Sequence, residues 1–380
     1  MRRERWQFWL VATVALSVAA CGDDDAPLPD GGTGPADLGG EADLGADDDL
    51  GAVEDLGAVE DLGSADLGQG DLGARVCDGP PGLYVGGSCT ELAPGVRPYA
   101  PQFRLWTDGA DKERFVFLPA TADIDTSNPD AWVYPTGTKL WKTFSLRGMR
   151  LETRLLEKTG SDIGAAAWRM RTFAWNAAQD VATEVTDGRL DVLGTGHDIP
   201  TPAQCARCHS GAARDVVLSF TAIQLNHSET PLSLQTLLDE GRLTAPVTTA
   251  TATIPGDATA RAALGYMHAN CGHCHGGAAP QAGLRLWVDV GLATVEETGT
   301  WLTGVDGASG WSASMPPPVT ARIEPGVSSG SSVVRRMDLR GSPAIPGDYV
   351  NQMPPLGTEV VDATGVEAVR SWIDSLTPTP

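Results

Sequence analysis

The sequence predicts an α+β fold, in which an N-terminal antiparallel β domain precedes mainly helical domains. Two observations support this prediction. Residues 75–195 hold aromatic and β-branched runs separated by turn residues, and from about residue 196 short amphipathic segments replace them. A long acidic stretch precedes both. We divide the chain into five parts, which are residues 1–20, 21–74, 75–195, 196–250 and 251–380.

Residues 1–20 are predicted to be a signal peptide. The apolar run 8–20 follows three arginines and has 13 residues, whereas a membrane span needs about 20. The run ends in Val-Ala-Ala before Cys21, which resembles a bacterial lipobox. That resemblance implies that Cys21 is acylated and anchors the protein to a membrane of the cell envelope, facing the periplasm or the cell surface. Gly22 resembles an outer-membrane sorting signal. An ordinary signal peptide cleaved near Ala20 is the alternative.

Residues 21–74 are predicted to be an acidic tether that follows the acylated cysteine. Residues 23–74 contain 16 Asp or Glu and no Lys or Arg, and they carry seven Asp-Leu-Gly tripeptides. The spacings match neither a helix face nor a heptad, and the single sign of charge predicts disorder. Calcium-binding repeats are the alternative, but one Asp per repeat supplies few of the oxygen ligands that Ca²⁺ needs.

Residues 75–195 are predicted to form an antiparallel sheet or sandwich. The runs 114–118, 139–144, 151–156 and 168–175 have strand composition, and Gly- or Pro-containing turns separate them. Seven basic residues accompany these runs. We expect them to cover a solvated outer face of the sheet, with a binding face as the alternative. They are Lys112, Arg114, Lys139, Lys142, Arg154, Arg169 and Arg171.

The remaining residues are predicted to be mainly helical. A first helix is expected over 233–241, where a glycine closes it, and a second over 259–270. A third covers 362–376, because Val366, Val369 and Ile373 fall three and four positions apart on one face.

One pentapeptide occurs twice in this helical part. Cys205-Ala-Arg-Cys-His209 recurs as Cys271-Gly-His-Cys-His275. Two thiols three positions apart can each form a thioether to one haem vinyl group, and the following histidine can bind the iron. A structural zinc site made of two Cys-x-x-Cys knuckles is the alternative, but it gives the two histidines no role. We therefore predict two covalently bound haem c groups, one held by Cys205, Cys208 and His209 and the other by Cys271, Cys274 and His275.

All seven cysteines can then be assigned. Cys21 takes lipid and four cysteines take the two haems, which leaves Cys77 and Cys89. An even pair in an oxidising compartment is expected to form a disulfide.

The helical part resembles a known family. The second pentapeptide, the loop Met353-Pro-Pro and the helix containing Val369-Arg-Ser-Trp-Ile resemble the last domain of class I cytochromes c. The wider chain resembles the Shewanella-type repeat protein family of bacterial dihaem c-type cytochrome lipoproteins. The resemblance covers about 100–376. The matching stretches are 105–112, 134–139, 152–156, 224–226 and 266–275.

The class I resemblance implies that Met353 is the second axial ligand of the second haem. Met315, which lies in an extra Met-Pro-Pro motif, and Met337 are rival ligands. The distal ligand of the first haem stays open. His197 and His227 are candidates, and a sixth position without a protein ligand is the alternative. His268 is expected to be a surface residue of its helix, and His273 to point to solvent.

The predicted function is electron transfer by a membrane-tethered dihaem cytochrome in the cell envelope. One alternative is a peroxidase-like haem enzyme with an open first haem, although only 66 positions separate Cys205 from Cys271. Another is a binding module in which the β domain captures a partner. The formal net charge is −22, and residues 75–380 carry −8 of it. This acidity argues against nucleic-acid binding and is compatible with a basic redox partner.

Overall fold

The structure of the protein is a computed structural model, and its described residues fall in one compact unit that spans Gln69–Pro380. The signal peptide, Cys21, the acidic tether and Met315 lie outside the described residues. Within the part that is described, no helix combines the length and the apolar character needed to cross a bilayer. The structure describes residues 76–210, 215–245, 247–277, 280–311, 319, 321–341 and 351–378.

The β part is a six-stranded antiparallel sheet in which each strand pairs with its neighbour in sequence. The four predicted runs are the four central strands, and two short edge strands complete the sheet. Together with the helices, this confirms a mixed α+β fold. The strands are β1 (Val96–Tyr99), β2 (Asp111–Phe117), β3 (Lys139–Leu146), β4 (Met149–Lys158), β5 (Trp168–Trp175) and β6 (Ala182–Val185).

One face of the sheet is covered by the segment that precedes it. Trp141 of β3 and Trp175 of β5 project from this face and pack on Leu83 of the covering segment. A disulfide joins Cys77 to Cys89 in the covering segment, with the two Cα atoms 5.5 Å apart, which is the pair that the cysteine count predicts. This disulfide closes a short loop and so limits how far the covering segment can unfold.

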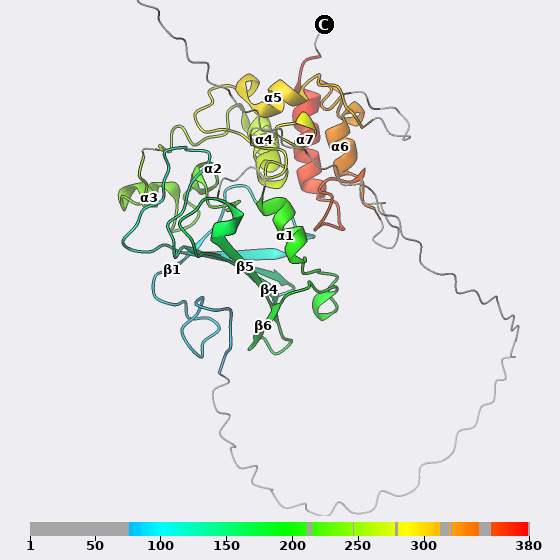
Figure 1. The fold of residues 1–380 in the computed structure, drawn as a ribbon. Helices are drawn as coiled ribbons and strands as arrows, with labels where there is room; N and C mark the ends of the chain where they lie inside the picture. The colour runs from blue at the N-terminus through cyan, green and yellow to red at the C-terminus, as the bar shows by residue number, and fades with distance from the viewer. Residues whose placement is uncertain are drawn as a thin grey trace, which may run out of the picture. The chain divides into compact units, whose positions relative to one another are not determined.

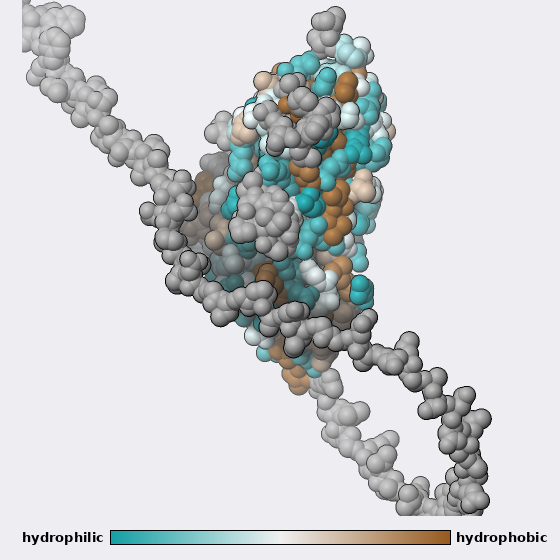
Figure 2. All heavy atoms as spheres, turned by 90° about the vertical axis from the view of Figure 1, so that its right-hand side faces the viewer, coloured by the Kyte–Doolittle hydropathy of each residue, from teal (hydrophilic) through white to brown (hydrophobic). Residues whose placement is uncertain are grey.

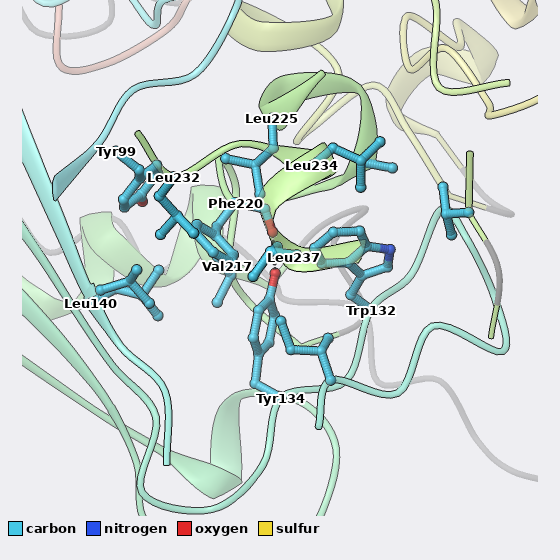
Figure 3. Close-up of a cluster of buried hydrophobic side chains, with 14 of the residues drawn as sticks. Tyr99, Trp132, Tyr134, Leu140, Val217, Phe220, Leu225, Leu232, Leu234 and Leu237 are labelled. Carbon is cyan, nitrogen blue, oxygen red and sulfur yellow. Dashed lines mark hydrogen bonds between the residues drawn. The ribbon is translucent and has the colours of Figure 1, made fainter. Parts of the chain in front are cut away.

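The opposite face of the sheet packs against residues 216–252. Phe220 lies at the centre of this core, and its ring is 4.8 Å from Tyr99 and 6.3 Å from Tyr134 between ring centroids (Figure 3). The Tyr134 hydroxyl donates a hydrogen bond to the Phe220 carbonyl. Because one continuous core joins the sheet to this segment, the residues predicted as the β domain and as the first haem segment pack together.

The basic residues of the sheet do not form one solvated outer face. Arg114 is only 4% exposed, and Lys142 and Arg154 project from the same face, which is the face opposite the covering segment. Lys139 projects from the other face, where it pairs with Glu157 at 3.1 Å, and Arg169 is exposed. The expectation of a solvated face was wrong for Arg114, because residues 196–250 cover a sheet face that the strand pattern alone leaves open.

Seven α-helices are described, and they include the three that the sequence predicts. Five short 3₁₀ turns also occur, at Ala165–Ala167, Val192–Gly194, Gln281–Gly283, Val295–Glu297 and Ser328–Gly330. The helices are α1 (Pro202–His209), α2 (Ala222–Leu225), α3 (Leu234–Asp239), α4 (Ala258–Asn270), α5 (Gly299–Gly304), α6 (Ser332–Met337) and α7 (Ala363–Ser375).

Helices α4 and α7 form the centre of a second core and lie side by side (Figure 1). Val366, Val369 and Ile373 of α7 are buried there, as their spacing predicts. Gly365 lies so close to the Tyr266 ring that a Cβ atom at this position would overlap it. The molecular face that carries α6 and α7 mixes polar residues with narrow apolar strips (Figure 2).

A short segment between β1 and β2 connects α4 to the loop in front of α7. The Asn270 side chain accepts from the Trp106 amide at 2.7 Å and donates to the Arg104 carbonyl at 3.1 Å. Asp108 accepts hydrogen bonds from the amides of Glu359 and Val360. Segments far apart in the sequence are therefore tied together at the end of α4, immediately before the second pentapeptide.

Candidate functional site

Helix α1 carries the first pentapeptide. Its N-terminus is closed by a capping box, in which the Thr201 hydroxyl accepts from the Gln204 amide at 3.3 Å and the Gln204 side chain accepts from the Thr201 amide at 2.8 Å. Pro202 occupies the first helical position, where its missing N–H costs nothing. Cys205 and Cys208 are half-buried. This Thr-Pro-x-Gln signal is visible in the sequence, although the sequence analysis does not predict the helix.

His209 ends α1 with its ring held by the backbone. Its Nδ1 atom lies 2.7 Å from the Val216 carbonyl oxygen, which requires Nδ1 to carry the proton. Burial lowers the pKa of His209 to about 4, so the ring is neutral near pH 7. The lone pair of a neutral ring then lies on Nε2, the atom that commonly binds metals.

The segment that supplies the Val216 carbonyl is itself fixed by a buried carboxylate. Asp215 forms an ion pair with Lys158 and accepts from the Trp168 indole N–H at 2.7 Å and from the Tyr134 amide at 2.9 Å. Val216 has a φ of 59°, a conformation that β-branched residues rarely adopt. These contacts, which the sequence analysis did not identify, hold the strained residue whose carbonyl orients His209.

The second pentapeptide continues from the C-terminal end of α4 as a further helical turn. The amides of Cys274 and His275 donate to the Cys271 carbonyl, at 3.1 and 2.8 Å. Nδ1 of His275 lies 3.0 Å from the Gln281 carbonyl oxygen and 3.2 Å from that of Leu284. As at His209, the backbone holds Nδ1 and leaves Nε2 as the free ligand atom. Burial lowers the pKa of His275 and so favours the neutral ring.

The two pentapeptides meet in space. Ligand atoms of Cys208, His273 and Cys274 all lie within 4.8 Å of one another. A hydrogen bond between the two thiols raises the pKa of Cys208 to about 12 and lowers that of Cys274. The two predicted sites therefore meet at these three residues. Cys271 lies outside the cluster, and burial raises its pKa to about 12.

His273 and His268 are both buried, so the expectations of a solvent-facing residue and a surface residue were wrong. His273 is 7% exposed because it packs against the first pentapeptide at Cys208, and its Nδ1 atom has no hydrogen-bond partner in the part of the chain that the structure describes. His268 is 2% exposed because its face of α4 packs on Trp287, with the ring centroids 4.3 Å apart. Its Nδ1 atom accepts from the Val288 amide, and its Nε2 atom has no partner among the described residues.

The two candidate distal histidines of the first site are engaged elsewhere. Nε2 of His197 lies 2.8 Å from the buried carboxylate of Glu152. His227 uses both ring nitrogens, because Nε2 donates to the Ala100 carbonyl at 2.7 Å and Nδ1 accepts from the Glu229 amide at 3.2 Å. Either ring would have to break these contacts to bind a metal.

Met353 lies in the loop before α7 and is half-buried. Its amide donates to the Arg336 carbonyl at 2.8 Å. Arg336 is also close enough for its charge to act on His275. Met353 and His275 therefore share a neighbour, whereas the rival Met337 is buried in the core around α4 and α7.

Comparison with protein-family models, with curated proteins and with solved structures gave no match.

Proposed function

We propose that the protein is a membrane-tethered dihaem c-type cytochrome that transfers electrons in the cell envelope. The observation that carries the proposal is the shared arrangement of the two pentapeptides. In each, the histidine after Cys-x-x-Cys is neutral and donates Nδ1–H to a backbone carbonyl, which leaves Nε2 to bind iron. This arrangement is what an axial haem ligand requires, and it occurs twice.

The residues fit two haem groups in the following way. Cys205 and Cys208 would form the thioethers of the first haem, and Cys271 and Cys274 those of the second. His209 and His275 would supply the proximal nitrogens, and Met353 the second ligand of the second iron. A bound haem would supply a one-electron iron couple. Since Cys208 and Cys274 are adjacent, the two groups bonded to them would be neighbours, which favours transfer between them.

A zinc site is the chemical rival, and the cluster of Cys208, His273 and Cys274 supports it in part. Structural zinc sites take four protein ligands. Only three groups converge here among the described residues, and Cys205 and Cys271 lie outside the cluster. The donor set therefore fits zinc less completely than it fits haem.

The mass of the intact, acid-acetone-extracted protein tests the proposal. Two covalent haems should add two haem masses to the mature polypeptide, and replacing both Cys271 and Cys274 with Ser should remove one of them. A polypeptide without added haem that contains bound zinc would refute the proposal and establish the zinc site.

The second candidate function is a peroxidase-like enzyme in which the first haem has an open sixth position. The hydrogen bonds of His197 and His227 favour it, because they occupy both candidate distal histidines. Ultraviolet-visible and electron-spin spectra discriminate between the two functions. Electron transfer predicts low-spin, six-coordinate iron at both haems, whereas the enzyme predicts a high-spin signal from one haem.

A further inference from the structure

Four basic residues of strands β2, β3 and β4 lie on one face of the sheet. Antiparallel pairing sets Arg114 of β2 opposite Lys142 of β3, and Lys142 opposite Arg154 of β4. Lys112 precedes Arg114 by two positions and so shares its face. We call these four side chains the cation row. Like charges directly opposite one another destabilise a sheet, so the row requires a compensating anion.

The sheet supplies one carboxylate to this row. Glu152 is fully buried and binds the guanidinium of Arg154 through both oxygens, at 2.6 and 2.9 Å. The same carboxylate also contacts His197 at 2.8 Å. Glu152 therefore compensates Arg154, and its charge is shared with a histidine.

Arg114 has donors that no described residue satisfies. Its side chain is 4% exposed, and its Nε and Nη2 atoms are buried without a hydrogen-bond partner. Its Nη1 atom donates only to the Lys112 carbonyl, at 3.4 Å. A buried guanidinium without acceptors is costly, so these donors point to an anionic ligand.

Lys142 is in a similar position beside it. The only contact described for its ammonium is the Phe144 ring, whose centroid is 4.8 Å from Nζ. Burial, together with the charges of Arg114 and Arg154, lowers the pKa of Lys142 well below its usual value. An anion bound at the row would reverse this effect by compensating the repulsion.

The row lies within electrostatic reach of the first pentapeptide. The charge of Arg154 acts on the Cys205 thiol, and the charges of Lys142 and Arg154 act on the His209 ring. Two members of the cation row therefore lie close enough to α1 for their charges to act on a group held there.

We propose that the cation row binds the two propionate carboxylates of the haem attached at Cys205 and Cys208. This inference rests on the proposed function. A haem carries two carboxylates, and charge-assisted hydrogen bonds from Arg114 and Lys142 would satisfy both the ligand and the buried donors. The β part then forms one wall of the first haem site.

Spectroelectrochemistry of the full-length holoprotein tests the inference, with Lys142→Gln and Arg114→Gln as variants. A cation beside a propionate stabilises the electron-rich ferrous state, so each change should lower the midpoint potential of one haem. That haem should be the one retained when Cys271 and Cys274 are replaced by Ser. Its propionate bands in the resonance Raman spectrum should shift, and Arg114→Lys should restore most of the potential. Lys139→Gln is the matched control, because Lys139 lies on β3 but on the opposite face, and it should change neither haem.

The outcomes separate this inference from the proposed function. A protein with two haems whose potentials and propionate bands are unchanged in the Gln variants would overturn the inference alone, and a protein without haem would overturn both. If Lys142→Gln prevents haem attachment, the midpoint potential and the propionate bands are measured on Arg114→Lys and Lys142→Arg instead. These two variants retain the charge. Added inorganic phosphate should cause no saturable shift in the midpoint potentials of the wild-type holoprotein. A saturable shift that Lys142→Gln removes would instead assign the row to an external oxyanion.

Discussion

Under the proposed function, Met353 is the second ligand of the second haem. Its loop is anchored by the bond from the Met353 amide to the Arg336 carbonyl, and two prolines follow it. We expect Met353→Ala to lower the potential of one haem, because a soft thioether stabilises ferrous iron. The near-infrared charge-transfer band of Met-ligated ferric haem should also disappear. Visible and near-infrared spectra of the oxidised protein measure this.

Met315→Ala is the control for this prediction, since Met315 begins the other Met-Pro-Pro motif. It should keep both the band and the potential. Loss of the band in Met315→Ala, with retention in Met353→Ala, would show that the two motifs have exchanged roles.

Single residues also show where sequence reasoning reaches its limit. The spacing of Cys205, Cys208 and His209 is a local chemical signature, and it can be read without a structure. The carbonyl that orients His209 belongs to Val216, beyond the helix, and is placed by the buried pair of Asp215 and Lys158. Such a contact depends on tertiary packing and leaves no periodic signal in the sequence.

At the scale of elements, the contact between α4 and α7 predicts the sign of a glycine substitution. In an exposed helix interior, replacing Gly by Ala stabilises by about 1 kcal/mol. At Gly365 the added methyl group would overlap the Tyr266 ring, and overpacking costs about 1–3 kcal/mol. We therefore expect Gly365→Ala to lower the free energy of unfolding, as measured by denaturant titration.

Thr364→Ala is the matched control, because Thr364 is the exposed neighbour of Gly365 on α7. It should leave the free energy of unfolding unchanged within about 0.5 kcal/mol. A Gly365→Ala protein that is more stable than wild type would show that Tyr266 can move away and that the helix contact is loose.

The elements that the sequence predicts are those with strong internal patterns. The central strands β3 and β5 combine aromatic and β-branched residues, and α7 repeats its apolar positions on one face. The edge strands β1 and β6 have four residues each, too few for a period to appear, and their pairing comes from their neighbours. The sequence likewise does not indicate which part of the chain covers each face of the sheet.

At the scale of the molecule, Asp130 joins the β part to the C-terminal part. Its carboxylate accepts from the Val290 amide at 2.7 Å. Burial raises the pKa of Asp130 from 3.8 to about 6. Between about pH 4 and pH 6 the folded state therefore binds more protons than the unfolded state, so this group makes the free energy of unfolding fall as pH rises through that window.

Asp130→Asn keeps an acceptor for Val290 and removes the titration. We expect the variant to gain stability relative to wild type, and to gain more at pH 7 than at pH 4, as measured by denaturant unfolding at both values. The same change at Asp162, which is exposed, should produce no such difference. An equal effect of Asp130→Asn at both pH values would contradict the raised pKa.

The predicted lipid anchor at Cys21 is tested by separating the membrane and soluble fractions of the cell envelope. Cys21 lies outside the described residues, and its acylation is a prediction from the Val-Ala-Ala-Cys junction. Cys21→Ser should move the protein from the membrane fraction to the soluble fraction, because no lipid would then hold the tether. If the substituted protein still sediments with membranes, another part of the chain provides the attachment.

The meeting of Cys208 and Cys274 has a consequence for biogenesis. In an oxidising compartment, two thiols this close in a folded chain can cross-link to each other, and the disulfide would remove one attachment sulfur from each pentapeptide. Under the proposed function, maturation is therefore a matter of timing. Haem ligation has to reach both thiols while α1 and α4 are still apart, and a chain that folds first would become trapped in a form that can no longer be loaded.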